Sequence, residues 1–196
     1  MISPILTCRC ALPPISVGEV LRYAGDKSQD DAVLSLLREC IKECEGIFSD
    51  KVAYRIFPIQ RKEEKLLIGS MEISSKGLSK NLEYCDEVIL LCACAGLDID
   101  RLIGKYSNLA PAKALLFHSI GTERVEALCD AFCREIEEKG LKLGARFSPG
   151  YGDLPLAFQK DILTLLNAGN TVGVGLNESL LLSPSKSVTA FVGIKK

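Results

Sequence analysis

The run Val88-Ile-Leu-Leu-Cys-Ala-Cys-Ala-Gly-Leu97 is the longest apolar stretch of the chain, with Asp86-Glu87 before it and Asp98 after it. Its length is about half of what a membrane-spanning helix needs, so it predicts a buried β-strand over residues 88–95. Because successive side chains of a strand point to opposite faces, Cys92 and Cys94 should share one face of the sheet. Their spacing does not fit a Cys-x-x-Cys redox or zinc motif.

Helices and a hairpin are expected on the N-terminal side of this run. Ser16-Val-Gly-Glu19 has the spacing of a capping box, which predicts a short helix that ends near Gly25. Apolar residues recur at helical spacing over residues 30–45, which predicts an amphipathic helix. Alternation of apolar residues predicts a strand over residues 52–58. The other elements expected before the run are a polar turn at 60–65, a strand at 66–68 and a helix over 75–84.

The C-terminal side of the run predicts more helices than strands. The expected elements are helices over 97–106 and 111–139, a loop over 144–155, a helix from Pro155 to about Asn167, and strands over 172–176 and 187–194. Gly140 is a suitable helix stop, and Gly121 is a candidate for a break or kink. Strands and helices do not alternate regularly, which favours an α+β fold with helices packed around a mainly antiparallel twisted sheet. We expect a single domain over residues 1–196.

The composition excludes several classes of function. Lysine and arginine number 24, and aspartate and glutamate 25, so the formal net charge is −1. This balance gives no long-range attraction to nucleic acid or to a membrane surface. The single histidine disfavours zinc hydrolases and catalytic triads, which often need several. Nine cysteines, an odd number, fit poorly with a secreted disulfide framework, and nothing at the N-terminus resembles a signal peptide, so we expect a cytoplasmic protein with reduced thiols.

Two pairs of cysteines lie four residues apart on the apolar faces of predicted helices, Cys40 with Cys44 and Cys129 with Cys133. Such a pair can supply two metal ligands, but the sequence offers no compact third and fourth ligand, and free cysteine packs as a small apolar residue. Core packing is therefore the favoured interpretation, and a thiol-based redox or metal protein is the weakest alternative. His118 lies on a predicted helix and is expected to be a packed or half-exposed residue rather than a catalyst.

The segment Arg146-Phe-Ser-Pro-Gly-Tyr151 combines a cation, a hydroxyl group and a phenol within six residues. Pro149 favours an extended Ser148, and Gly150 leaves the backbone open to a ligand. Arg146 can bind a carboxylate through two nitrogens, and Tyr151 offers a ring face and a hydrogen-bonding tip. The segment therefore suits a zwitterionic or nucleoside-like ligand in a surface groove, although a structural turn with a solvated arginine explains these residues equally well.

The same segment resembles the Arg-x-x-Pro-Gly-Tyr motif of the activation domain of vitamin B12-dependent methionine synthase. Gly173-Val-Gly-Leu-Asn-Glu-Ser179, Pro184 and Ser187-Val-Thr-Ala190 resemble the closing segment of that domain. The resemblance is strong over residues 146–193, fair over 111–145 and only topological before them. The continuation Gly-Asp-Leu-Pro-Leu after Tyr151 looks like the short, stand-alone members of the family.

The resemblance implies that the region 126–193 binds S-adenosylmethionine. In the family, this ligand and an electron donor remethylate the cobalamin after its cobalt has been oxidised to the inactive cob(II) state. Arg146 would contact the methionine carboxylate of the ligand, and Asp130 would attend its ammonium group. Ser148, Gly150 and Tyr151 would line the nucleoside side. We expect no catalytic residue and no metal ligand in this chain.

The resemblance also implies partners. The cobalamin would be carried by a cobalamin-dependent methionine synthase or a related corrinoid protein, and a flavodoxin-like or other electron donor would supply the reductant; no nucleic acid or membrane is expected. The chain lacks the homocysteine, folate and cobalamin modules. We therefore expect an accessory component of a methyltransferase in methionine biosynthesis rather than a complete enzyme.

Two departures from the family pattern leave a second interpretation open. Gly152-Asp-Leu-Pro155 stands where the longer enzymes carry Pro-Ala-Cys-Pro and then an acid-His pair, and Asp130 stands where they carry glutamate. Glu178 is retained, but it fits a ligand-binding and a structural role equally well. The alternative is a non-catalytic interaction module that docks on a corrinoid protein without binding S-adenosylmethionine.

Overall fold

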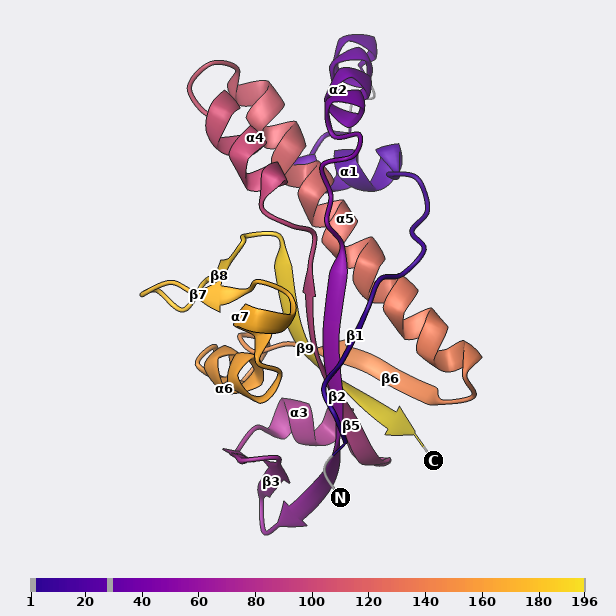
Figure 1. Ribbon diagram of the computed structural model, residues 1–196, viewed down its shortest axis with the longest axis vertical. Helices are drawn as coiled ribbons and strands as arrows, with labels where there is room; N and C mark the ends of the chain where they lie inside the picture. The colour runs from indigo at the N-terminus through magenta and orange to yellow at the C-terminus, as the bar shows by residue number, and fades with distance from the viewer. Residues whose placement is uncertain (1–2, 28–29, 196) are drawn as a thin grey trace.

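The computed structural model describes residues 3–27 and 30–195; residues 1, 2, 28, 29 and 196, which the expected single domain also includes, lie outside the described residues. In this part of the chain a seven-stranded sheet has the order β4-β3-β2-β5-β9-β6, with β1 beside β2. Its strand pairs are antiparallel, and the long strands β2 and β9 cross at an angle, as in a twisted sheet (Figure 1). The expected α+β class is confirmed.

The sheet combines long central strands with short peripheral ones, and the helices vary widely in length. The strands are β1 (Leu6–Cys8), β2 (Lys51–Lys62), β3 (Lys65–Ile68), β4 (Met71–Ile73), β5 (Cys85–Cys94), β6 (Lys142–Phe147), β7 (Gly175–Leu176), β8 (Leu182–Ser183) and β9 (Ser187–Lys195). The helices are α1 (Val17–Ala24), α2 (Asp31–Glu43), α3 (Lys76–Asn81), α4 (Asp98–Tyr106), α5 (Pro111–Glu138), α6 (Phe158–Leu165) and α7 (Ala168–Thr171). Strands β7 and β8 form a separate two-stranded sheet.

The central strand β5 is buried on both of its faces. Cys92 and Cys94 point into an apolar cluster that includes Ile162 of α6, whereas Leu91 and Ala93 point into a cluster with the second half of α5. Figure 1 shows α5 on one side of the sheet and α3, α6 and α7 on the other. The predicted strand, and the prediction that the two thiols share one face, are confirmed.

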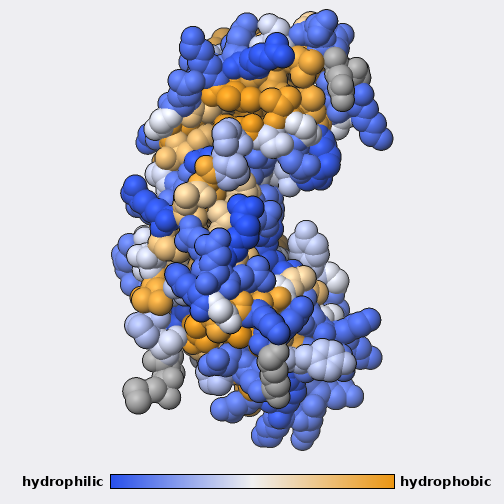
Figure 2. All heavy atoms as spheres, turned by 90° about the vertical axis from the view of Figure 1, so that its right-hand side faces the viewer, coloured by the Kyte–Doolittle hydropathy of each residue, from blue (hydrophilic) through white to orange (hydrophobic). Residues whose placement is uncertain are grey.

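A helical end extends beyond the sheet, where α1, α2 and α4 pack around the first half of α5. Helix α1 begins after Ser16 as predicted, and the Ser16 hydroxyl accepts a hydrogen bond from the Glu19 N–H at 3.4 Å. The reciprocal half of the capping box is not formed, because the Ser16 N–H donates to Oε1 of Glu123 at 3.0 Å. It ends at Gly25, whose φ of 73° lies in the left-handed region. Apolar side chains reach the surface between polar ones at this end (Figure 2).

Helix α5 is continuous through Gly121, so the expected break is wrong. The absent side chain serves close packing instead. A Cβ atom at Gly121 would lie 2.8 Å from Cγ of Lys186 and 3.0 Å from Cγ1 of Ile99. Glycine therefore lets the stem of Lys186, at the start of β9, and the helix α4 approach α5 closely.

Several boundaries differ from the predictions: β2 extends to Lys62 into the turn predicted at 60–65, α3 ends at Asn81, and three further differences lie in the C-terminal half of the chain. The loop predicted from residue 144 is wrong over residues 144–147, which belong to β6; Arg146 and Phe147 pair with β9, and the register shifts between Leu143 and Arg146. Helix α6 begins at Phe158, because residues 155–157 form turns in which the Phe158 N–H donates to the Pro155 carbonyl at 3.2 Å. The strand predicted over 172–176 is reduced to β7, since Gly173 has a φ of 75° and interrupts the extended backbone.

All nine cysteines are free thiols, and eight of them are members of the buried clusters or pack against one in the described core: Cys8, Cys10, Cys40, Cys44, Cys92, Cys94, Cys129 and Cys133. Cys85 is buried as well. Residues 3–27 and 30–195 contain no group of three or more histidine, cysteine or carboxylate side chains placed to hold a metal ion. None of the helices described is both long enough and apolar enough to cross a membrane.

Candidate ligand-binding site

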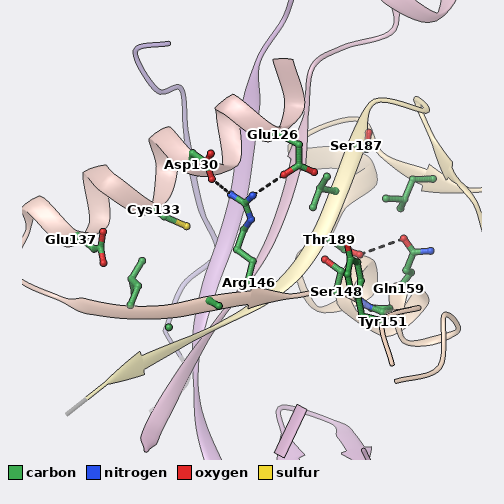
Figure 3. Close-up of a pocket in the computed structure, with 16 residues that line it drawn as sticks. Glu126, Asp130, Cys133, Glu137, Arg146, Ser148, Tyr151, Gln159, Ser187 and Thr189 are labelled. Atoms are coloured by element: carbon green, nitrogen blue, oxygen red, sulfur yellow. Dashed lines mark hydrogen bonds and ion pairs between the residues drawn. The ribbon is translucent and has the colours of Figure 1, made fainter. Parts of the chain in front are cut away.

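A cavity of about 590 Å³ lies where the second half of α5 faces β6, β9 and the start of α6 (Figure 3). Its walls come from segments far apart in the sequence, and β6 carries the first part of the Arg146–Tyr151 segment to its edge. The lining residues are Glu126, Asp130, Cys133, Glu137, Leu143, Gly144, Ala145, Arg146, Ser148, Pro149, Tyr151, Gln159, Leu182, Ser187, Val188 and Thr189. The structure thus brings together four of the five predicted site residues, Asp130, Arg146, Ser148 and Tyr151.

Arg146 is held by two carboxylates of α5 (Figure 3). One of its terminal nitrogens donates to Oδ1 of Asp130 at 2.6 Å, and the other donates to Oε2 of Glu126 at 2.7 Å. The two acids are four residues apart, which places them on the same face of the helix. Burial opposes the charge of Arg146, but Cys129, Asp130 and Glu126 outweigh it and raise the pKa of the guanidinium.

The exposure of these three side chains decides how a ligand can reach them. The Arg146 side chain is 23% exposed, the Glu126 side chain 38% and the Asp130 side chain 64%. The guanidinium therefore lies at the base of the charged end, and the Asp130 carboxylate lies in contact with solvent. A ligand with both an ammonium and a carboxylate group would find a partner for each, because Asp130 and Arg146 already lie side by side and neither helix α5 nor strand β6 has to move.

The turn that follows β6 is closed by Gly150. Its N–H donates to the Leu154 carbonyl at 2.9 Å, and the Tyr151 N–H donates to the Ser148 carbonyl at 3.1 Å. Gly150 has a φ of 92°, so a side chain there would strain the turn. Gly150 itself is not among the residues that line the cavity, and its place in the structure is in the turn that carries Ser148 and Tyr151. Tyr151 stands at the rim and is 69% exposed.

The opposite end of the cavity is neutral and buried. The Gln159 amide donates to the Leu180 carbonyl at 2.8 Å, and the Thr189 hydroxyl donates to the Gln159 amide oxygen at 3.4 Å. Gln159 is 6% exposed and Thr189 2%. This end therefore offers amide and hydroxyl groups without a charge, in contrast to the end that holds Arg146.

Several lining residues were missed from the sequence. Glu126, Asp130, Cys133 and Glu137 follow one another at helical spacing along α5, so the periodicity around Asp130 contains the signal for the other three. Gln159 and Thr189 carry no comparable local signal. Burial raises the pKa of the Cys133 thiol, which therefore stays protonated at neutral pH and is a poor nucleophile.

The segment Gly152-Asp-Leu-Pro155 has a structural role. Asp153 accepts hydrogen bonds from the Ser75 hydroxyl and the Lys76 N–H at 2.6 Å and from the Gly77 N–H at 3.1 Å, which fixes the turn to α3. These hydrogen bonds lower the pKa of Asp153, and the one from the Ser75 hydroxyl contributes most. Glu178 is exposed in the β7–β8 turn and does not line the cavity, nor does His118, which is exposed on α5.

Among solved structures, the fold is similar to a crystal structure of the MetH reactivation domain bound to AdoHcy (S-adenosylhomocysteine). The TM-score is 0.68 at 13% sequence identity, and the match covers 98% of this chain and 79% of that chain. A likeness at this identity establishes the fold and not the ligand. No family model and no curated protein match the sequence.

Proposed function

We propose that the cavity between α5 and β6 binds S-adenosylmethionine. The observation that carries the proposal is the pairing of Arg146 with Asp130 and Glu126 at one end of a cavity whose rim holds Tyr151. An amino-acid zwitterion needs one cation and one anion side by side, and this end supplies both. The similarity of the fold to a domain bound to AdoHcy supports the same assignment.

In this proposal the ligand carboxylate binds Arg146 and its ammonium group binds Asp130. Ser148 and Tyr151 then line the side of the nucleoside, since both border the cavity beyond Arg146. Gly150 acts through the turn that positions these two residues. The neutral end with Gln159 is of a suitable chemistry for the uncharged parts of the ligand.

The bound ligand would serve a partner. Methyl transfer from a sulfonium needs a nucleophile in line with the methyl carbon, and the lining residues of this chain supply no thiolate or other strong nucleophile. We therefore propose an accessory role in the reductive remethylation of cobalamin carried by a methionine synthase or related corrinoid protein, with an electron donor as the source of electrons. The ring of Tyr151 is exposed, so the rim of the cavity is open to the approach of such a partner.

Calorimetry with S-adenosylmethionine tests the binding step. Arg146→Ala removes a charge-assisted contact of about 1.5–3 kcal/mol, so its affinity should fall roughly tenfold to a hundredfold. Arg134→Ala is the matched control, because Arg134 is exposed on α5 and does not line the cavity. Equal losses in both variants would contradict the assignment of Arg146.

The second candidate function is an interaction module without a ligand. The contacts of Arg146 with two carboxylates favour it, because they satisfy the guanidinium within the protein. No heat from the wild-type chain at millimolar S-adenosylmethionine, together with binding to a corrinoid protein, would establish this alternative.

The role in remethylation needs the partner in the assay. The chain, S-adenosylmethionine, a reductant and the partner in the cob(II) state are mixed, and the methylcobalamin spectrum is followed. Remethylation should depend on this chain and should be lost when Arg146→Ala and Tyr151→Phe are combined. If it proceeds equally well without the chain, the accessory role is wrong even where the ligand binds.

A further inference from the structure

We propose that Cys8 and Cys10 form a redox site, in which a low-molecular-weight disulfide oxidises the two thiols to a reversible disulfide bond. The site lies at the N-terminal segment of the sheet, and neither thiol lines the cavity between α5 and β6. The proposal therefore does not depend on the binding of S-adenosylmethionine.

Both thiols lie on the same face of the N-terminal segment. Cys8, Cys10 and Leu12 pack against the apolar cluster that includes the second half of α5, whereas Arg9 and Ala11 between them are exposed. This alternation is that of an extended chain, in which side chains two residues apart point the same way. The two thiols therefore lie side by side, and each changes the pKa of the other.

The chain contains the same Cys-x-Cys spacing a second time, in different surroundings. Cys92 and Cys94 are 0% and 2% exposed in β5, which is paired with β2 on one side and with β9 on the other. Cys8 and Cys10 are half-buried, and the pairing of β1 with β2 ends at Cys8. An oxidant can therefore reach the N-terminal pair more easily, and the paired strands hold its backbone less firmly.

The backbone of this segment can bring the two sulfur atoms together. Cα atoms two residues apart in a strand are about 6.6 Å apart, close to the upper limit of about 6.8 Å for a disulfide. Closure therefore needs a small contraction of the segment after Cys8. Because such strain makes a disulfide easier to reduce, an excess of a small thiol should return the pair to the dithiol.

The neighbouring groups give the two thiols different roles. Burial is the largest cause that raises the pKa of each thiol, and the Glu135 carboxylate of α5 raises both further. The Cys10 thiol and Lys139 lower the pKa of Cys8 in part, whereas Cys8 raises that of Cys10. Cys8 therefore forms a thiolate more readily and attacks first, and Cys10, beside Glu135, reacts second.

The reaction moves two electrons from the protein thiols to the small disulfide. The Cys8 thiolate attacks one sulfur of that disulfide, its S–S bond breaks, and the released small thiolate takes up the proton that Cys8 gave up. Glu135 then accepts the proton of the Cys10 thiol, whose sulfur attacks Sγ of Cys8. The second small thiolate leaves and takes the proton from Glu135. The net products are one protein disulfide and two small thiols.

Oxidised glutathione is the probe for this reaction. The reduced protein is incubated with it, the excess is removed, and the thiols are titrated in denaturant. The nine free thiols should fall by two, to seven, and dithiothreitol should restore all nine. Peptide mapping by mass spectrometry should find the new bond between Cys8 and Cys10.

Three variants test the role of each group. Cys10→Ser should keep one glutathione on Cys8, because no second thiol remains to displace it, whereas Cys8→Ser should form no protein disulfide. Glu135→Gln should slow closure of the bond by up to about a hundredfold, so that the mixed disulfide on Cys8 accumulates. Glu138→Gln, exposed on the same helix, is the matched control.

Several outcomes would overturn the proposal. They are nine thiols left in the wild-type protein, a bond between Cys92 and Cys94 instead, and the same loss of two thiols in Cys8→Ser. Stable glutathione adducts on both Cys8 and Cys10 of the wild type would also overturn it, because the two sulfurs would then be unable to meet. Equal rates of closure in Glu135→Gln and its control would refute Glu135 as the base.

Discussion

The buried ammonium group of Lys186, which lies between the helical end and the ligand cavity, should lower the stability of the fold. Lys186 is 5% exposed, directly before Ser187 of the cavity wall, and its ammonium nitrogen donates to the Thr122 hydroxyl at 3.1 Å. Burial lowers the pKa of Lys186 from 10.5 to about 8, while Asp100 opposes the shift. The titratable groups that face it are Asp100 of α4 and His118 of α5; the pKa of His118 is itself lowered by burial and by Lys186, so its imidazole is neutral at pH 7.

The sign and size of the effect on stability follow from this pKa. Below pH 8 both states carry the proton, and the folded state bears the cost of a buried charge, about 3 kcal/mol for this shift at roughly 1.4 kcal/mol per pKa unit. Between pH 8 and 10.5 the folded protein loses the proton before the unfolded chain does. The unfolded state then binds more protons, so this contribution to stability rises with pH.

Lys186→Met should therefore raise the free energy of unfolding by about 1–3 kcal/mol at pH 7, since methionine keeps the stem that packs on Gly121. The gain should shrink toward zero by pH 10.5. Thr122 does not become unpaired, because its hydroxyl also donates to the His118 carbonyl at 2.9 Å. Lys195→Met, at the exposed end of β9, is the control and should change little.

Urea unfolding of both variants and the wild type at several pH values measures this effect. The difference between variants is needed, because burial raises the pKa of thiols such as Cys44, to about 12. The unfolded chain then releases thiol protons first, and stability falls with rising pH for this reason. A loss of stability in Lys186→Met at pH 7, or a gain that does not change up to pH 10.5, would refute the reasoning.

Three further predictions use other parts of the fold. Gly121→Ala should destabilise the protein by about 1–3 kcal/mol in thermal unfolding, since its Cβ would meet Lys186 and Ile99. Gly104→Ala, whose Cβ would have no heavy atom of another segment within 4 Å, should stabilise α4 by about 1 kcal/mol. If Gly104→Ala were the more destabilising of the two, the packing at Gly121 would be contradicted. Thiol titration in denaturant should recover nearly all nine cysteines as free thiols, and metal analysis should find no stoichiometric zinc or iron. Sedimentation with the corrinoid partner should show weak association, micromolar or looser, that is tighter in the cob(II) state than in the methylated state. The reason is that the arrangement with this chain on the cofactor competes with the arrangement that the partner uses in normal turnover. Equal affinities in the two states would contradict this competition.

Local patterns predicted the elements whose cause is local. A few neighbouring residues are enough to predict three elements: the start of α1 from its cap at Ser16, α2 from its helical apolar stripe, and β5 from its unbroken apolar run. Strand β6 does not, because Gly144 and the glycines and prolines of residues 149–155 together are typical of a loop, and the extended form of β6 depends on pairing with β9, some 45 residues later. The close approach of Lys186 to Gly121 likewise depends on two distant segments meeting.

The site shows the same division, with a consequence for its function. The motif predicted a guanidinium free for a ligand carboxylate, but β6 carries Arg146 to α5, where Glu126 and Asp130 already bind it. A zwitterion can enter without a net loss of ion pairs, because its carboxylate takes the guanidinium while its ammonium group takes the carboxylates released. Such an exchange keeps the count of charge contacts nearly constant, so the affinity must come from what the exchange adds. Two further contributions to affinity are available. One is apolar and stacking contact with Tyr151, and the other is the attraction of a cationic ligand to the one negative charge that Glu126 and Asp130 together keep beside Arg146. A simple zwitterion such as methionine should therefore bind far more weakly than its sulfonium nucleoside derivative, although both present the same carboxylate and ammonium groups to Arg146 and Asp130.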